Sequence, residues 1–321
     1  MKTFKIPGTD LESSTLAYGC MNIGGKWNNP EVTNTERSTA YNAINAAIDE
    51  GINLFDHADI YVRGKSELVF GELLRQDPGL RNRIILQSKC GIRFAGDPHP
   101  HSPARYEFSY DHIVGSVEGI LRRLNTSHLD ILLLHRPDAL AEPAEVARAF
   151  DHLYKSGKVR WFGVSNHHAG QIDLLKKFVD QPIVINQVEI SLLHRSLIEE
   201  GILFNQSTVG ISGSSGTLDY CQKHDILLQA WSPVAAGKLF VRGRGAPDAL
   251  IQLINDLAGA YRTSVEAIVL GWLTRHPALI QPIIGTVNTD RIKASAMVDD
   301  IELTHEDWYR LLGAARGESV P

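Results

Sequence analysis

The stretch Asn53-Leu-Phe-Asp-His-Ala-Asp-Ile-Tyr61 decides the fold, because a hydrophobic run ends within it and ionisable side chains follow at once. Two further hydrophobic runs end in the same way, at Lys89 and at His135. A carboxylate (Asp56), a phenol (Tyr61), an amine and an imidazole are therefore expected at the ends of successive strands. Burying them separately would be costly, because a buried charge must be paired or neutralised. We predict that the four groups lie together and satisfy one another.

Strand-length hydrophobic runs alternate with helical patterns along the chain. Thr33 with Glu36 forms a capping box, and Pro143 opens a later helix. We expect strands at residues 14–19, 53–56, 84–90, 129–135, 159–164, 183–188, 226–231 and 280–286. About eight strands alternating with helices predict an α/β fold, a closed (β/α)8 TIM barrel with active groups at the C-terminal strand ends. An open doubly wound sheet is the alternative, but no G-x-G-x-x-G follows the first strand.

Two segments lie outside this alternation. Residues 3–12 predict a β-hairpin with its turn at residues 7–10, which we expect to plug an opening of the barrel. The Ser/Gly-rich residues 205–216 predict a mobile surface loop rather than a domain linker, because a strand pattern resumes at Ile226. We therefore predict a single domain over residues 1–321.

Composition excludes several classes of protein. With 43% hydrophobic and 21% charged residues and a net charge of -5, the chain is unlike a nucleic-acid-binding protein. Its three cysteines are too few and too scattered for a disulfide framework or a metal site, and His99-Pro-His101 lacks a third ligand nearby. The start has no apolar signal core, and no run reaches the roughly 18 apolar residues that span a bilayer. We expect a cytoplasmic monomer that acts on a small molecule, without metal, membrane or nucleic acid.

The four strand-end groups suit proton transfer. An ammonium at Lys89 would favour the phenolate of Tyr61 and lower its pKa from about 10, which makes the phenol a usable general acid. Asp56 would pair with Lys89, and His135 can donate to the oxygen of a bound carbonyl. This set supplies no electrons, so we expect a nicotinamide cofactor as hydride donor. An alternative uses Lys89 as a Schiff-base nucleophile, but an Asp56 partner that keeps the amine protonated argues against it.

The same residues resemble a known family. Asp56-x4-Tyr61, Lys89 in Gln-Ser-Lys-Cys-Gly and His135 in Leu-Leu-Leu-His-Arg-Pro-Asp look like the catalytic tetrad of the aldo-keto reductases. The resemblance covers nearly the whole chain in the family's order, through residues 163–166, 186–187, 230–234 and 284–291. Within the family the chain most resembles the bacterial YdhF-type oxidoreductases, and the potassium-channel beta subunits are more distant.

This resemblance implies reversible, NADPH-dependent reduction of an aldehyde or ketone to an alcohol, with Tyr61 as proton donor. The channel subunits suggest an alternative, an NADP-binding regulatory or sensor subunit with little turnover. The substrate itself is not implied. Its pocket is expected to be walled by the loops at residues 26–29, 92–108 and 202–216.

The resemblance also implies residues that bind NADPH or NADP+. Ser165, Asn166 and Gln187 would hold the nicotinamide carboxamide, and Trp231 would stack on the ring. Arg291 would contact the 2′-phosphate, which favours NADP over NAD. Gly285 replaces a lysine of many members, and Ala294-Ser295 replace Glu-Asn, so the adenine ribose should be bound more weakly or differently. The resemblance also implies that helices near the C-terminus help to bind the cofactor. The other expected cofactor contacts are Cys20, Met21, Asp56, Ser232, Pro233, Val234, Lys238, Arg242 or Arg244, Gly285, Thr286, Val287 and Ser295.

Overall fold

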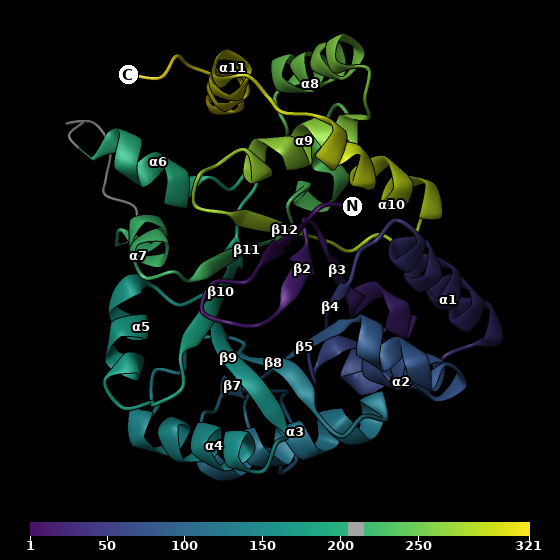
Figure 1. The fold of residues 1–321 in the computed structure, drawn as a ribbon, viewed down its shortest axis with the longest axis vertical. Coiled ribbons are helices and arrows are strands. Elements are labelled where there is room, and N and C mark those ends of the chain that lie inside the picture. Colours follow the sequence, from purple (N-terminus) through teal and green to yellow (C-terminus); the bar gives the residue numbers. More distant parts are fainter. Residues whose placement is uncertain (205–214) are drawn as a thin grey trace.

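A computed structural model describes residues 1–204 and 215–321 of the chain. Eight parallel strands close into a barrel (Figure 1), in chain order β3 (Ala17–Gly19), β4 (Leu54–Asp56), β5 (Ile85–Cys90), β8 (Leu129–Leu134), β9 (Val159–Ser165), β10 (Ile183–Glu189), β11 (Leu227–Trp231) and β12 (Ile280–Ile284). The barrel predicted from the alternation is confirmed, and the doubly wound sheet is excluded. Most of the predicted Ser/Gly-rich loop lies outside the described residues.

Helices surround the barrel in Figure 1, and α8 and α11 lie on its outside at one edge. The helices are α1 (Asn34–Asp49), α2 (Lys65–Gln76), α3 (Tyr110–Leu124), α4 (Pro143–Lys155), α5 (Ala169–Lys176), α6 (Ser196–Leu203), α7 (Thr217–Lys223), α8 (Asp248–Tyr261), α9 (Val265–Thr274), α10 (Thr289–Ala296) and α11 (His305–Arg316). Short 3-10 helices are η1 (Cys20–Gly24), η2 (Tyr61–Gly64), η3 (Pro78–Arg83), η4 (Ala235–Phe240) and η5 (Met297–Asp300).

The helix starts follow the capping residues seen in the sequence. Thr33 and Glu36 form the predicted capping box of α1, and Pro143 is the first residue of α4. Ser109, Ser264 and Thr304 each accept a hydrogen bond from the third residue of the helix that follows. One predicted strand is wrong in extent: residues 14–19 do not form one strand, because Ser14 ends the hairpin strand and β3 begins only at Ala17.

The N-terminal hairpin closes one end of the barrel. It pairs β1 (Thr3–Lys5) with β2 (Glu12–Ser14) in antiparallel register. Ile6 and Leu11, from its turn, belong to one buried hydrophobic cluster with residues of the barrel strands: Ala17, Leu54, Ile85, Ile131, Leu133, Val184, Ile185, Leu227 and Ile283. We call this set the plug cluster. Since burial of apolar surface is the main driving force of folding, the hairpin closes the barrel as predicted.

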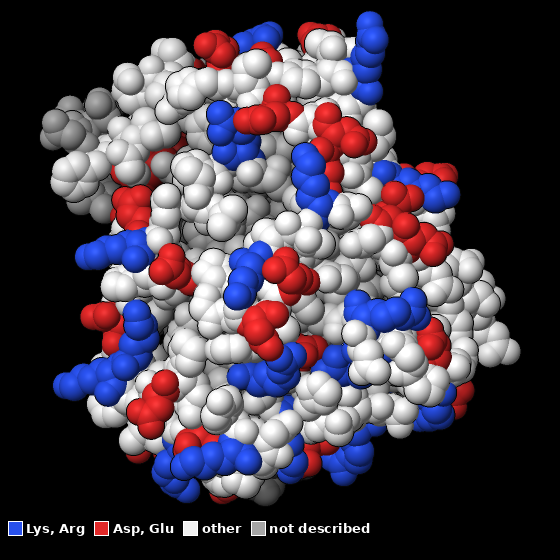
Figure 2. All heavy atoms as spheres, viewed as in Figure 1, with Lys and Arg blue, Asp and Glu red and all other residues white. Residues whose placement is uncertain are grey.

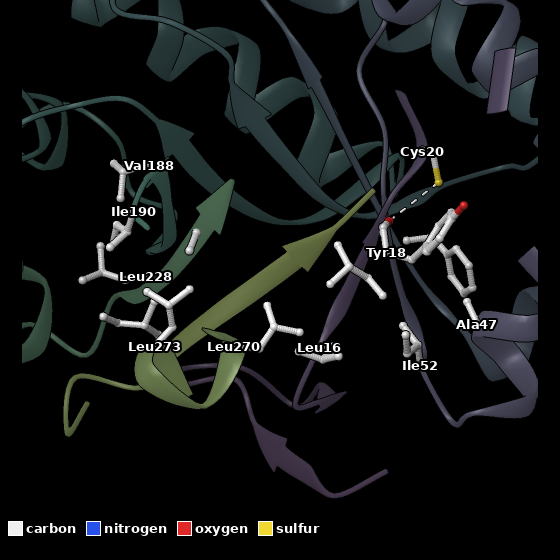
Figure 3. Packing of buried hydrophobic residues seen from close by; sticks show 14 of the residues in the cluster. Leu16, Tyr18, Cys20, Ala47, Ile52, Val188, Ile190, Leu228, Leu270 and Leu273 are labelled. Carbon is white, nitrogen blue, oxygen red and sulfur yellow. Dashed lines mark hydrogen bonds between the residues drawn. The ribbon is translucent and has the colours of Figure 1, made fainter. Parts of the chain in front are cut away.

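A second, larger core lies between strands and helices. Leu16, Tyr18 and Cys20 alternate with the inward-facing Ala17, so they point out of the barrel toward Ala47 and other buried residues (Figure 3). The Cys20 thiol lies 3.7 Å from the carbonyl oxygen of Tyr18 (Figure 3). The alternation of one short strand therefore separates the residues of the two cores.

The surface in Figure 2 carries acidic and basic side chains intermixed over the visible face. No helix within residues 1–204 and 215–321 is long and apolar enough to cross a bilayer. In the same residues, no group of three or more His, Cys, Asp or Glu side chains could hold a metal ion.

Candidate active site

Asp56 and Lys89 form a buried ion pair at the C-terminal end of two neighbouring strands. Asp56 ends β4 beside Gln87 of β5, and Lys89 lies two residues farther along β5. Lys89 Nζ lies 2.6 Å from Asp56 Oδ2 and 2.7 Å from Oδ1, and the side chains are 0% and 2% exposed. Burial lowers the pKa of Lys89, but Asp56 and then Tyr61 raise it by more, so its pKa lies above the usual value. The amine is therefore held as a cation.

Four glutamines, which we call the glutamine layer, support this pair from inside the barrel. The amides of Gln87 and Gln187 donate to Asp56 Oδ1 at 2.7 and 3.1 Å. Both also donate to Gln229, which in turn donates to Gln281 at 3.0 Å. The layer fixes the carboxylate from beneath. Of its members the sequence reasoning found only Gln187; the available signal was a glutamine inside each of four apolar strand patterns.

Tyr61 lies on the cavity side of the ion pair. Its ring centre is 5.0 Å from Lys89 Nζ and 6.0 Å from the ring of His135, which it meets edge-on at 82°. The next two residues, Val62 and Arg63, have φ of 48° and 56°, a conformation that is costly for a β-branched residue and that clusters at functional sites. The backbone thus makes a strained turn directly after Tyr61.

The predicted lowering of the Tyr61 pKa is wrong as a net effect. Burial raises its pKa above the ordinary value; Lys89 lowers it, and Asp56 raises it again. Lys89 acts in the predicted direction, but burial outweighs it because the phenol is enclosed. The phenol is consequently protonated at neutral pH.

His135 follows β8 directly and lines the same cavity. Burial, then the charges of Lys89 and Arg136, hold its pKa well below the usual range, so the imidazole is neutral at neutral pH. Its Nδ1 is buried and has no hydrogen-bond partner among the described residues. A neutral imidazole that lines the cavity can donate a hydrogen bond to a bound oxygen from one of its ring nitrogens.

These residues surround a cavity of about 650 Å³. Fifteen of the predicted site residues line it: Met21, Asp56, Tyr61, His135, Ser165, Asn166, Gln187, Trp231, Ser232, Pro233, Val234, Gly285, Thr286, Arg291 and Ser295. Trp27 and Ile92, from two of the predicted pocket walls, line it as well. Other lining residues were not predicted, although most are sequence neighbours of predicted ones: Gly19, Asn22, Ile60, Arg136, Ala236, Gly237, Phe240, Glu266, Ile283 and Ile284.

Five predicted site residues do not line the cavity. Lys89 lies behind Asp56, fully buried. Cys20 is buried in the outer core, because strand alternation turns it to the same side as Tyr18. Lys238 and Arg242 are exposed, and Arg242 donates to Gln252 at 2.9 Å. Neither these two nor Val287 reaches the cavity lining.

Asn166 joins three of the strand ends. It adopts φ of 62°, a left-handed conformation that asparagine tolerates. Its amide donates to the carbonyl of His135 at 3.1 Å and to the hydroxyl of Ser165 at 2.8 Å, and its Oδ1 accepts from the Trp231 indole at 3.0 Å. Trp231 is thereby fixed at the cavity wall.

The segment after β11 has the geometry of an anion site. Ser232, Ala235, Ala236 and Gly237 have φ between 48° and 79°, and all but Ala235 line the cavity. Left-handed residues close together can orient backbone N–H groups toward a common point. In this turn the N–H groups of Ala235 and Gly237 donate to the carbonyls of Ser232 and Val234, each at 2.9 Å. Arg291 of α10 lines this end of the cavity, with its Nε 4.0 Å from Glu266 Oε1. An arginine beside this turn in the cavity lining suits the phosphates of a dinucleotide.

A comparison with protein-family models matches residues 15–315 to the aldo/keto reductase family. The chain belongs to the aldo/keto reductase family. Among its relatives, the oxidoreductase YdhF of Escherichia coli is 38% identical over 280 residues, covering 87% of this chain and 88% of that one. The uncharacterized oxidoreductase YcsN of Bacillus subtilis is 36% identical over 317 residues, covering 97% of each. A 6-dehydroglucose reductase of Agrobacterium fabrum is 35% identical, also covering 97% of each.

Solved structures agree on the fold. A glycerol dehydrogenase from Gluconobacter oxydans superposes with a TM-score of 0.82 at 24% identity, covering 99% of this chain and 96% of that one. The holo form of an aldo-keto reductase from Bacillus halodurans superposes with a TM-score of 0.76 at 25% identity, covering 99% and 98%. The predicted family, its YdhF-type relatives and the barrel class are confirmed, and this aldo/keto reductase is an oxidoreductase.

Proposed function

We propose that this aldo/keto reductase reduces an aldehyde or ketone to an alcohol with NADPH, reversibly. The observation that carries the proposal is the buried Asp56–Lys89 pair beneath Tyr61, beside a neutral His135 at one cavity wall. These groups can deliver a proton to a carbonyl oxygen and stabilise the charge that develops on it. The name of the Agrobacterium relative, a 6-dehydroglucose reductase, supports the same kind of chemistry.

Each of the four residues has a distinct role in this proposal. Tyr61, protonated at neutral pH, donates its proton to the carbonyl oxygen as the alcohol forms. Lys89 stabilises the resulting phenolate by its charge, and Asp56 keeps Lys89 protonated and in place. His135 donates a hydrogen bond to the same oxygen and orients it. A reduced nicotinamide, when bound, would supply the hydride that the carbonyl carbon accepts.

The cofactor fits the cavity from two sides. Ser165, Asn166 and Gln187 would hold the carboxamide, and Trp231 offers an indole face for the ring. The left-handed segment at residues 232–237 would take the pyrophosphate, and Arg291 the 2′-phosphate, which is the basis for proposing NADPH over NADH. We also propose a cytoplasmic monomer with a single domain over residues 1–321.

The test is a titration with NADPH and NADH followed by tryptophan fluorescence, since Trp231 lines the cavity. Addition of 4-nitrobenzaldehyde then shows turnover as loss of reduced-cofactor absorbance. Tighter binding of NADPH together with turnover supports the proposal. Binding without turnover would favour a regulatory or sensor role instead, and binding of neither cofactor would contradict the whole assignment.

A further inference from the structure

The charged residues that line the cavity are Asp56, Arg136, Glu266 and Arg291. Asp56 is neutralised by Lys89 at 2.6 Å, and Glu266 and Arg291 lie 4.0 Å apart at the other end. Arg136 makes no ion pair and no side-chain hydrogen bond with any residue in 1–204 or 215–321; its one described contact is with the Trp231 ring. Among residues 1–204 and 215–321, the cavity lining therefore carries one positive charge, that of Arg136, without an ion-pair partner.

Arg136 lies at the reacting end of the cavity. It follows His135 directly, is partly buried, and has its guanidinium carbon 5.6 Å from the centre of the Trp231 ring. Trp231 is in turn bonded to Asn166, and Asn166 to the His135 carbonyl. This chain of contacts connects Arg136 to the strand ends that hold the tetrad.

The nearest carboxylate in sequence does not serve Arg136. Asp138 Oδ2 accepts from the backbone N–H of Phe108 at 3.0 Å, and its Oδ1 accepts from that of Leu140 at 2.9 Å. Both oxygens of Asp138 are thus engaged in holding loops. Stacking on Trp231 is a structural role that Arg136 does have, and such a contact is worth about 0.5–1 kcal/mol. This contact engages none of the five N–H donors of the guanidinium in a hydrogen bond with the described residues.

We propose that Arg136 binds a carboxylate of the substrate, so that the preferred substrates are aldehydes or ketones that also carry a carboxylate. A guanidinium fork matches the two oxygens of a carboxylate better than any neutral group. The spacer between the two groups is apolar, because Trp27, Ile60 and Ile92 line the same cavity. This inference rests on the proposed function and names the substrate class of that site.

A matched pair of substrates tests the proposal: 4-carboxybenzaldehyde and its neutral methyl ester, methyl 4-formylbenzoate. We expect the wild type to show a higher kcat/KM for the acid. A charged hydrogen bond is worth about 1.5–3 kcal/mol, so Arg136→Gln should reduce the ratio of acid to ester by about tenfold to a hundredfold. Arg63→Gln is the matched control, because Arg63 is exposed, stacks on Phe94 at 4.6 Å and lies outside the cavity lining. It should leave the ratio unchanged.

Two results would overturn the proposal: equal kcat/KM for acid and ester in the wild type, or an unchanged ratio in Arg136→Gln. A third would do so as well. If Arg136→Gln weakens NADPH binding and slows both substrates equally, the anion that Arg136 serves is the cofactor's pyrophosphate.

Binding separates this inference from the proposed function. The protein is first saturated with NADP+ and then titrated with benzoate or with benzamide in a calorimeter. This measurement needs no turnover. Tighter binding of benzoate, lost in Arg136→Gln, supports the anion site even if no aldehyde is reduced, which would contradict only the proposed function. Equal binding of benzoate and benzamide overturns the anion site even if the aldehydes are reduced.

Discussion

The two ends of the barrel interior are built from the same strands but from opposite chemistry. At the plugged end, the plug cluster consists of aliphatic side chains, and Ile6 and Ile131 are both 0% exposed. At the open end, the inward positions hold Asp56 and Lys89, with Tyr61 and His135 beside them. The glutamine layer separates the two. One strand therefore changes from apolar to ionised side chains within a few residues, as β4 does between Leu54 and Asp56.

This difference between the two ends indicates that the plugged end contributes mainly to stability and the open end to ligand binding. In the plug cluster, apolar side chains pack against one another, and of its members only Ile283 is among the described residues that line the cavity. At the open end, Asp56 pairs with Lys89 and Glu266 lies near Arg291, but the guanidinium of Arg136 has no ion pair or hydrogen bond among the described residues. Polar groups that a protein leaves unsatisfied in a cavity mark the place where a ligand binds.

The largest expected effect is that of Tyr61→Phe at the open end. A positioned general acid contributes about 10²–10⁴ in rate, so turnover should fall by that factor while cofactor binding and the melting temperature stay near wild type. Turnover is measured by a steady-state activity assay, cofactor binding by fluorescence titration, and the melting temperature by thermal unfolding. Tyr106→Phe, an exposed tyrosine on β7 (Arg105–Tyr106), is the matched control. Full activity in Tyr61→Phe would remove the proposed proton donor.

At the plugged end, Ile6→Ala should do the reverse. It removes buried methyl groups from the plug cluster, and such truncations cost about 2–5 kcal/mol in the free energy of unfolding. Because Ile6 does not line the cavity, kcat and KM should be unchanged at temperatures where the variant is folded. Urea unfolding and assays at 25 °C provide the measurement, with the exposed Lys5→Ala as control. A parallel loss of kcat in the folded variant would show that the two ends are not independent.

Arg291→Ala tests which cofactor the open end of the barrel prefers, NADPH or NADH. If Arg291 contacts the 2′-phosphate, its loss removes a charged hydrogen bond worth about 1.5–3 kcal/mol, so NADPH should bind about tenfold to a hundredfold more weakly and NADH much less so. Arg75→Ala on α2, which removes an exposed charge outside the cavity lining, is the control. Equal losses for both cofactors, measured by fluorescence titration, would exclude the 2′-phosphate assignment.

Local features of the fold could be read from the sequence. The capping box at Thr33, the proline at α4 and the polar residues at strand ends act over a few residues, so spacing alone predicts them. Other features depend on partners distant in the chain. The glutamine layer joins Gln87 to Gln229 across 142 positions, and neither strand pattern indicates the other. Short helices such as α6 and α7 were missed, because their patterns span only two turns.

The sequence predicted which residues form the site better than it predicted their pKa values. The order of ionisable strand ends indicated Asp56, Lys89 and His135 together, which the structure places around one cavity wall. The pKa of Tyr61 was predicted in the wrong direction, because the sequence names the neighbouring charge but not the extent of burial that opposes it. The sequence shows Arg136 beside His135 but does not indicate a role for it. The proposed role depends on the structure, in which Arg136 has no carboxylate partner among the described residues.

The smallest expected effect concerns Asp59, which lies behind the open end. Its backbone N–H donates to the carbonyl of Lys89 at 3.0 Å. Burial, then the charge of Glu67, raises the pKa of Asp59 to about 7, although Arg123 opposes this. The folded state therefore holds a proton on Asp59 that the unfolded chain, with its carboxyl pKa near 3.9, releases at lower pH.

The sign of the pH dependence follows from this proton. Between about pH 4 and pH 7 the folded state binds more protons at Asp59 than the unfolded state does, so the contribution of Asp59 to stability falls as the pH rises. Asp59→Asn removes this dependence. We expect the free energy of unfolding of the variant, relative to wild type, to be higher at pH 7.5 than at pH 5, by on the order of 1 kcal/mol.

Urea unfolding of both proteins at the two pH values measures the difference. His57, whose pKa burial lowers to about 3, gives the opposite slope over part of the range, but it titrates in both proteins and cancels in the comparison. A difference between variant and wild type that is the same at pH 5 and pH 7.5 would mean that Asp59 is ionised in the folded state. In that case the ion pair of Glu67 and Arg123, which are 2.7 Å apart, would have to accommodate a second carboxylate, and burial would not dominate the pKa of Asp59.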